Sequence, residues 1–161
     1  MICVTGTPGV GKSAAMKELL NRGCAASEFD GLIDECVLEV KDDERIVDQN
    51  CLRRIRSDGT YFGHLSHYAR CDKVVVIRAH LKDIEIRLSK RGYSRSKIMD
   101  NVESEAIDLI GFEAEKMHSG NTFEVLNLSV EETADFIENV IKGKNSTSVK
   151  IDLLEEILDW Y

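Results

Sequence analysis

The sequence predicts an α/β fold built on a parallel sheet, because short apolar runs rich in β-branched residues alternate with amphipathic helical patterns. The clearest strand covers residues 74–77, where four consecutive β-branched residues are typical of a strand buried on both faces. Another apolar run, residues 1–5, ends at Gly6, and the helical pattern that follows over 12–22 ends at Gly23. We therefore expect the chain to open with a strand, a glycine-containing loop and a helix.

The remaining elements alternate in the same way, each bounded by a turn signal or by a change in hydrophobic period. We expect helices at 30–40, 45–56, 81–90, 96–117 and 130–141, and strands at 60–65 and 122–128. Residues 142–150 are polar and have the composition of a linker. Residues 151–161 carry apolar side chains at helical spacing, which predicts a short C-terminal helix. This helix packs on the body of the protein, or docks on a partner or another subunit.

Composition limits the class of protein. At 161 residues the chain has the size of one domain, and its net charge of −8 argues against a surface that binds nucleic acid directly. No stretch approaches the ~20 apolar residues that a membrane span requires. The five cysteines are scattered and form no CxxC pair. We therefore expect neither a disulfide framework nor a zinc site, and a reducing, cytoplasmic environment.

Residues 6–13, GTPGVGKS, form the pattern Gly-x4-Gly-Lys-Ser between the first predicted strand and the first predicted helix. This is the phosphate-binding P-loop pattern, and its place in the chain makes the match specific. Glycines let successive backbone N–H groups converge on phosphate oxygens, and the helix N-terminus adds the positive end of its dipole. We expect Lys12 to bridge the β- and γ-phosphates of ATP or GTP, and the Ser13 hydroxyl to ligate Mg²⁺. Because the motif begins six residues from Met1, we expect no signal peptide.

A basic segment lies about 75 residues after this loop. Residues 86–97, IRLSKRGYSRSK, contain five basic residues and no acidic one, in a chain whose net charge is negative. The segment is a candidate lid over the phosphates, since an arginine fork stays charged and can hold two phosphate oxygens. Arg87 and Arg91 are four residues apart and would share one helix face. The alternative interpretation is a solvated basic face.

Four segments together resemble one protein family. They are GTPGVGKS at 6–13, FGHLSH at 62–67, VVVIRAH at 74–80 and RLSKRGYSRSKIMDNVESE at 87–105. The family comprises the archaeal and eukaryotic adenylate kinase-like P-loop proteins of the adenylate kinase isoenzyme 6 type, which also assist maturation of the small ribosomal subunit. The similarity covers residues 1–142, and its most specific part is the pattern RGY-x3-K-I-x2-N-V-x2-E over 91–105.

The resemblance implies a P-loop NTPase of the nucleoside-monophosphate-kinase type, with a five-stranded parallel sheet and helices on both of its faces. It divides the chain into a kinase domain over 1–142, with an acceptor region near 28–51 and a lid near 90–100, and a linker and C-terminal helix over 143–161. By matching position, the resemblance implies that residues of the loop bind ATP, namely Gly6, Gly9, Val10, Gly11, Lys12, Ser13 and Ala14, with Arg91 as the lid arginine. Arg87, on the same predicted helix face as Arg91, is a further candidate ATP-binding residue.

The activity implied by the resemblance is phosphate transfer from ATP to AMP, or to another nucleoside monophosphate, with Mg²⁺, together with ATP hydrolysis. The implied partner is a platform protein of the small ribosomal subunit, bound during 16S rRNA processing. Three interpretations follow: a nucleotide kinase with weak ATPase activity, an ATP-driven assembly factor with residual kinase activity, and a kinase for another small metabolite. The acceptor segment counts against the third interpretation, because it lacks the arginine-rich pocket that a carboxylate substrate needs.

The sequence departs from the family pattern in two places. Family members carry an acidic residue before the Gly-His pair, where it helps to hold Mg²⁺ through water, and this chain has Phe62 there. Family members also often carry an arginine in the acceptor helix for the AMP phosphate, and residues 31–40 contain none. With Phe62 in that place we expect Mg²⁺ to be held loosely, unless another carboxylate, Asp34 or Asp30, takes over this role. For the missing arginine, Arg53, Arg54 or Arg56 is a candidate replacement, unless these three form a solvated face.

His64 and His67 have the spacing H-x-x-H. At a strand end followed by a loop, two such side chains need not point together, so a metal site is the weakest interpretation. The family pattern favours His64 near the γ-phosphate, where it would orient water or the acceptor. A structural histidine is an equally weighted alternative.

Overall fold

The framework of the computed structural model, which describes residues 1–144 and 149–161, is a sheet of five parallel strands. In spatial order the strands are β2 (Ser27–Glu28), β5 (Thr60–Phe62), β1 (Ile2–Thr5), β6 (Lys73–Arg78) and β7 (Thr122–Leu126). The four β-branched residues of β6 are at most 1% exposed, because β1 and β7 flank this strand and helices cover both faces. The predicted α/β fold with a five-stranded parallel sheet is confirmed.

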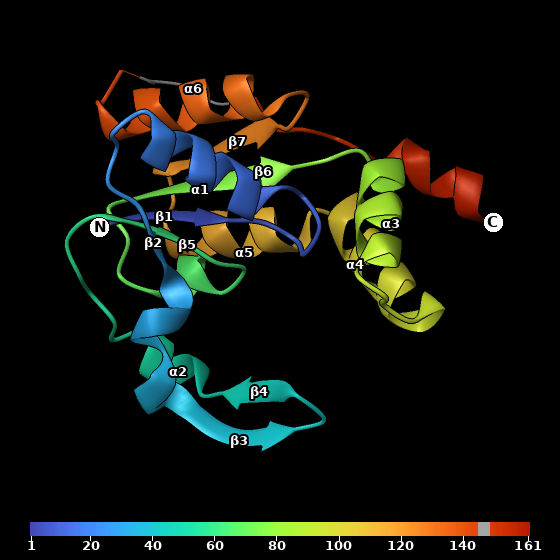
Figure 1. Ribbon diagram of the computed structural model, residues 1–161, viewed down its shortest axis with the longest axis horizontal. Helices are drawn as coiled ribbons and strands as arrows, with labels where there is room; N and C mark the ends of the chain where they lie inside the picture. Colours follow the sequence, from blue (N-terminus) through green and yellow to red (C-terminus); the bar gives the residue numbers. More distant parts are fainter. Residues whose placement is uncertain (145–148) are drawn as a thin grey trace.

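Helices cover the sheet on both faces (Figure 1). The helices α1 (Lys12–Asn21) and α6 (Val130–Ile141) pack together on one face, and α5 (Leu109–Met117) lies on the other. Their apolar faces close two buried clusters, one that includes Leu19 and Ile137 and one that includes Ala114. The helices α3 (Leu81–Lys90) and α4 (Arg95–Ala106) pack against each other beyond the carboxyl ends of β1 and β6.

The long helix predicted over 96–117 is wrong, because the chain breaks it into α4 and α5 at Asp108. This residue has φ 54°, a left-handed conformation that aspartate tolerates better than most side chains. Its carboxylate turns inward and lies 3.1 Å from the guanidinium of Arg78. The break therefore brings a charged side chain to a buried arginine, and a continuous amphipathic pattern in the sequence does not reveal it.

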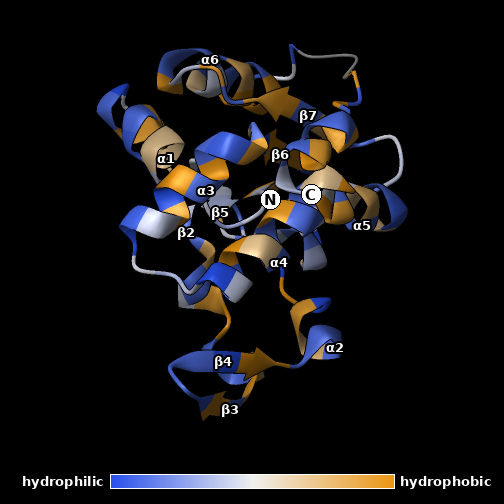
Figure 2. Cartoon of the chain, turned by 90° about the vertical axis from the view of Figure 1, so that its right-hand side faces the viewer, coloured by the Kyte–Doolittle hydropathy of each residue, from blue (hydrophilic) through white to orange (hydrophobic). Residues whose placement is uncertain are grey.

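The helices predicted over 30–40 and 45–56 are also wrong. The first segment forms two 3-10 turns, Phe29–Leu32 and Asp34–Cys36, and then β3 (Val37–Lys41). The second forms β4 (Glu44–Val47) and a short helix α2 (Gln49–Leu52). The two strands are antiparallel and are joined by Asp42 and Asp43, both at positive φ, as in a tight two-residue hairpin turn. The hairpin projects away from the sheet (Figures 1 and 2).

The C-terminal residues pack on the body of the protein. The helix predicted over 151–161 is a 3-10 helix, Leu154–Trp160, that runs beside α3 and α4. The Glu156 carboxylate accepts from the backbone N–H of Leu81 at 2.9 Å and so caps the start of α3. Of the predicted linker, residues 145–148 lie outside the described part of the chain. Among residues 1–144 and 149–161, no helix combines the length and the apolar character that crossing a membrane demands.

The expectation of no disulfide framework is wrong. Cys3 bonds to Cys71, and Cys36 bonds to Cys51, while Cys24 is the free thiol of the described residues. Both pairs are made by tertiary structure rather than by a local pattern. The hairpin brings the 3-10 turn at Cys36 back onto α2, and the start of β1 lies beside the loop that leads into β6. No motif in the sequence predicts either contact.

We expect the Cys36–Cys51 bond to stabilise the fold by constraining the unfolded chain. For its separation of 15 residues, the loop-entropy model gives about 3 kcal/mol. Cys51→Ser should lower the free energy of unfolding in urea by about that amount. Cys24→Ser is the matched control and should change little, since a serine hydroxyl can still donate to Glu138 as the thiol does. An unfolding midpoint for Cys51→Ser equal to that of the wild type would contradict the bond's contribution.

Candidate active site

The glycine-rich loop that joins β1 to α1 has a backbone only glycine can adopt at two points. Gly11 has φ 108°, and a Cβ there would lie 2.4 Å from the Asn127 side-chain nitrogen. A Cβ on Gly6 would lie 2.6 Å from the carbonyl oxygen of Ile77 on β6. No side chain caps the N-terminus of α1 within the described chain, so its first N–H groups face the loop. The loop therefore offers backbone donors and a helix dipole to an anion.

Lys12 lies at the mouth of this loop. Its ammonium donates to the carbonyl oxygens of Gly6 at 2.6 Å and Thr7 at 3.1 Å. Burial lowers the pKa of Lys12 to about 7, an effect that the nearby Glu105 carboxylate opposes and the Arg91 charge reinforces. A phosphate in the loop would give this amine an anionic partner and favour its charged form. Ser13 follows at the exposed start of α1, where its hydroxyl can be reached by a cation.

Three side chains from other elements hold the loop in place. Arg87 of α3 donates to the carbonyl oxygen of Gly9 at 2.9 Å, and Asn127, after β7, donates to that of Val10 at 2.8 Å. From the third side, the Thr7 hydroxyl donates to Glu105 of α4 at 2.6 Å. Of the predicted lid residues, Arg87 therefore contacts the loop directly. Arg91, at the C-terminus of α3, lies close enough to lower the pKa of Lys12.

A cleft of about 380 Å³ opens beside the loop, between the β3–β4 hairpin and α4. Its walls carry Pro8 from the loop, Arg45 from the hairpin, His64 after β5, and Tyr93 and Lys97 from the predicted lid. The Lys97 ammonium lies 2.5 Å from the Glu44 carboxylate of the hairpin, so an ion pair spans the cleft. The cleft thus connects a phosphate-binding loop to a second polar wall.

The two histidines of the H-x-x-H pattern lie in different places. His64 is exposed to the cleft, where desolvation by the walls and the charge of Lys12 lower its pKa. His67 is 1% exposed, and its ring nitrogens contact the Thr5 hydroxyl at 3.0 Å and the Glu113 carboxylate at 2.9 Å. His67 is therefore structural. No cluster of three or more His, Cys, Asp or Glu side chains among the described residues has the arrangement to hold a metal ion.

Sequence reasoning missed the arginine that faces the cleft. Arg53, Arg54 and Arg56 line other surfaces, and Arg56 pairs with Asp72. The cleft arginine is Arg45, whose guanidinium lies 3.0 Å from the carboxylate of Asp34 and 3.9 Å from that of Asp30. A helix predicted over 45–56 placed Arg45 with the other arginines. Only the hairpin turns it toward the loop.

The position that lacks the acidic residue has a carboxylate beside it. Phe62 is 1% exposed and packs in the apolar cluster beneath α1. The register of β2 against β5 pairs Glu28 with Phe62, and paired residues of parallel strands point to the same face of the sheet. The charge of Glu28 also raises the pKa of Lys12. The Glu28 carboxylate therefore acts on Lys12 of the loop, whereas those of Asp30 and Asp34 pair with Arg45.

The Ser13 hydroxyl and a nearby carboxylate are a donor set that suits Mg²⁺, an ion that prefers oxygen ligands and keeps several waters. Ser13 would ligate the ion directly, and Glu28 would hold its waters. The cation would neutralise charge on the phosphates between the loop and the cleft.

Comparison with known proteins agrees with this geometry. A family model described as "AAA domain" matches residues 2–108. A solved structure of an uncharacterized protein from Eubacterium ventriosum shares the fold, with a TM-score of 0.51 over 88% of this chain and 97% of that chain, at 11% identity. A protein named "Putative adenylate kinase" from Archaeoglobus fulgidus is 32% identical, with 99% of this chain and 94% of that protein covered. One of the same name from Pyrococcus furiosus is 38% identical, with 89% and 84% covered. The chain belongs to the adenylate kinase-like family of P-loop proteins with an AAA domain.

Proposed function

We propose that this protein is an adenylate kinase, which transfers the γ-phosphoryl group of ATP to AMP and releases two molecules of ADP. The observation that carries the proposal is the cleft between the loop and the hairpin. The glycine-rich loop that carries Lys12 borders the cleft at Pro8, and Arg45 lines its hairpin wall, so the cleft offers a cationic group for a second anion beside the loop. A kinase that acts on two nucleotides needs this arrangement, whereas a simple nucleotide-binding module does not.

In the proposed reaction a phosphate oxygen of AMP attacks the γ-phosphorus, and the bond from that phosphorus to the β–γ bridging oxygen breaks. The backbone of residues 6–14 holds the phosphates of ATP, and Lys12 bridges the β- and γ-phosphates. Arg87 fixes the loop at Gly9, and Arg91 reaches the phosphates from the lid. The attacking oxygen is already an anion, so no general base is required. His64 orients the acceptor in the cleft.

The resemblance and one surface support a second candidate function, that of an ATP-driven assembly factor. The hairpin exposes Leu38 at 70%, Val40 at 64% and Ile46 at 45%, a protruding apolar surface that a protein partner would cover. Such a partner would be a platform protein of the small ribosomal subunit, met in the cytoplasm during 16S rRNA processing. In this function His64 would orient a water for ATP hydrolysis.

The first experiment follows ADP formation from ATP with and without AMP. We expect formation to depend on AMP, and Lys12→Ala to abolish it. Loss of a charge positioned at the transferred phosphoryl costs about 3 kcal/mol or more, which is a fall of about 100-fold or more. Lys17→Ala, on the exposed side of the same helix, is the matched control. Turnover by Lys12→Ala within about tenfold of wild type would refute the role of the lysine, and ADP formation indifferent to AMP would favour the assembly factor.

A second experiment tests which arginine binds the acceptor. Arg45→Ala should raise the KM for AMP by about 10- to 100-fold and leave the KM for ATP unchanged, because a hydrogen bond to a charged group contributes about 1.5–3 kcal/mol. Arg54→Ala is the control, since Arg54 lies outside the cleft. An equal rise in both KM values for Arg45→Ala, or an effect confined to Arg54→Ala, would show that Arg45 does not bind the acceptor.

A third experiment tests the carboxylate beside Phe62. Glu28→Gln should raise the Mg²⁺ concentration needed for ADP formation by about 10-fold or more, because losing a group that holds metal-bound water commonly weakens metal binding by that amount. Binding of Mn²⁺ to the protein with a non-hydrolysable ATP analogue gives a readout that does not depend on turnover. Glu35→Gln, an exposed carboxylate on the second 3-10 turn, is the control. If Mn²⁺ binds equally to Glu28→Gln and the wild type, Glu28 does not hold the cation's waters.

A further inference from the structure

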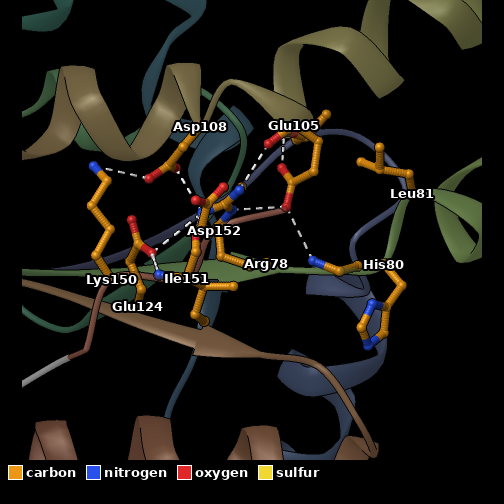
Figure 3. Close-up of polar contacts among 12 residues, drawn as sticks. Arg78, His80, Leu81, Glu105, Asp108, Glu124, Lys150, Ile151 and Asp152 are labelled. Carbon is orange, nitrogen blue, oxygen red and sulfur yellow. Dashed lines mark hydrogen bonds and ion pairs between the residues drawn. The ribbon is translucent and has the colours of Figure 1, made fainter. Parts of the chain in front are cut away.

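Glu105, near the C-terminus of α4, is a buried carboxylate whose two oxygens serve different parts of the chain. It is 3% exposed. Its Oε1 accepts from the Arg78 Nε at 2.9 Å and from the backbone N–H of Ala79 at 3.0 Å (Figure 3). Its Oε2 accepts from the Thr7 hydroxyl at 2.6 Å. One side chain therefore joins the end of β6 to the glycine-rich loop.

Neutralising Arg78 does not by itself account for this arrangement. The Arg78 guanidinium also lies 3.1 Å from the Asp108 carboxylate and 3.2 Å from that of Glu124, and it donates to the Ile151 carbonyl at 2.8 Å (Figure 3). Burying a further carboxylate costs free energy, which its contacts must offset. Besides its bonds to Arg78 and to the Ala79 N–H, Glu105 holds the Thr7 hydroxyl, a contact that does not serve to neutralise Arg78.

Thr7 is buried in the loop and contacts the Lys12 ammonium. It follows Gly6, is 2% exposed, and its carbonyl oxygen accepts from the Lys12 ammonium at 3.1 Å. On the other side, Glu105 ends a helix that carries Lys97 and Asn101 to the wall of the cleft. Helix α4 therefore connects the wall of the cleft to the Lys12 ammonium through two hydrogen bonds, Thr7 to Glu105 and Lys12 to Thr7.

We propose that Glu105 is a positioning residue that holds Thr7, and with it the Lys12 end of the loop, in the conformation that binds the phosphates of ATP. The effect of this role on turnover rests on the proposed adenylate kinase activity, whereas its effect on ATP binding does not. Without the hydrogen bond the loop must be ordered by the nucleotide itself, so affinity for ATP falls. AMP binds elsewhere in the cleft and is not affected.

The test uses Thr7→Val, which keeps the shape of threonine and removes its hydroxyl, and Thr7→Ser, which keeps a hydroxyl. We expect calorimetry to show about 10-fold weaker ATP binding for Thr7→Val and near wild-type ATP binding for Thr7→Ser. In assays of ADP formation, the KM for AMP should be unchanged. Thr122→Val is the matched control, because it deletes a hydroxyl that donates to the His118 carbonyl at 3.3 Å, at the start of β7. Its ATP affinity should match that of the wild type.

A double-mutant cycle with Glu105→Gln shows whether the two residues act through each other. We expect Glu105→Gln to weaken ATP binding too, and the double variant to bind no more weakly than the weaker single variant. Additive losses would overturn the proposal, as would ATP binding by Thr7→Val within twofold of wild type, or equal losses for ATP and AMP. If the wild type binds ATP but forms no ADP with AMP, the proposed function fails while the binding comparison still decides the role of Glu105.

Discussion

The ion pair between Arg78 and Glu105 connects the parts of this protein that must work together. Arg78 ends β6, Glu105 closes α4, and their contacts extend to the glycine-rich loop and to the C-terminal segment through Ile151. Lys150 adds a second cation, 3.1 Å from Asp108, beside the same carboxylates. Burial raises the pKa of Glu124 to about 7, so near neutral pH this carboxyl group is partly protonated and carries less than a full negative charge. Removing one partner of such a buried pair costs about 3–5 kcal/mol, because the other is left as an uncompensated charge.

The two sides of the site are attached to the rest of the protein in different ways. The loop is fixed by Arg87, Asn127 and Glu105, each from a different element. The hairpin is attached differently, since β3 and β4 are almost wholly exposed and the Cys36–Cys51 bond ties their base to α2. A phosphate-binding loop fixed by several contacts beside a projecting hairpin would suit a kinase, which must exclude water before transfer.

The sheet and the loop could be predicted from the sequence because both depend on local patterns. The β-branched run over 74–77 is explained by burial on both faces, and the glycines of residues 6–13 are explained by backbone angles that other residues cannot adopt. The hairpin could not be predicted in the same way. Its strands face solvent, so they show no clear alternation of apolar and polar residues, and its turn uses Asp42 and Asp43 at positive φ in place of glycine. That one error hid Arg45 and the Cys36–Cys51 bond, because both depend on the chain folding back. Glu28 and Glu105 depend on the register of neighbouring strands and on the break at Asp108, which are properties of the folded chain.

The Lys97–Glu44 ion pair makes entry to the cleft sensitive to ionic strength. Both side chains are largely exposed, at 45% and 67%, so the pair contributes only about 0–1 kcal/mol, and salt at physiological concentration screens charges beyond about 8 Å. Added salt therefore loosens the bridge between the hairpin and α4 and makes the cleft easier to enter. The same salt weakens the long-range attraction between the basic segment 86–97 and a nucleotide polyanion. The two effects oppose each other, so the association rate should pass through a maximum at intermediate ionic strength, a signature that a rigid, permanently open cleft would not give.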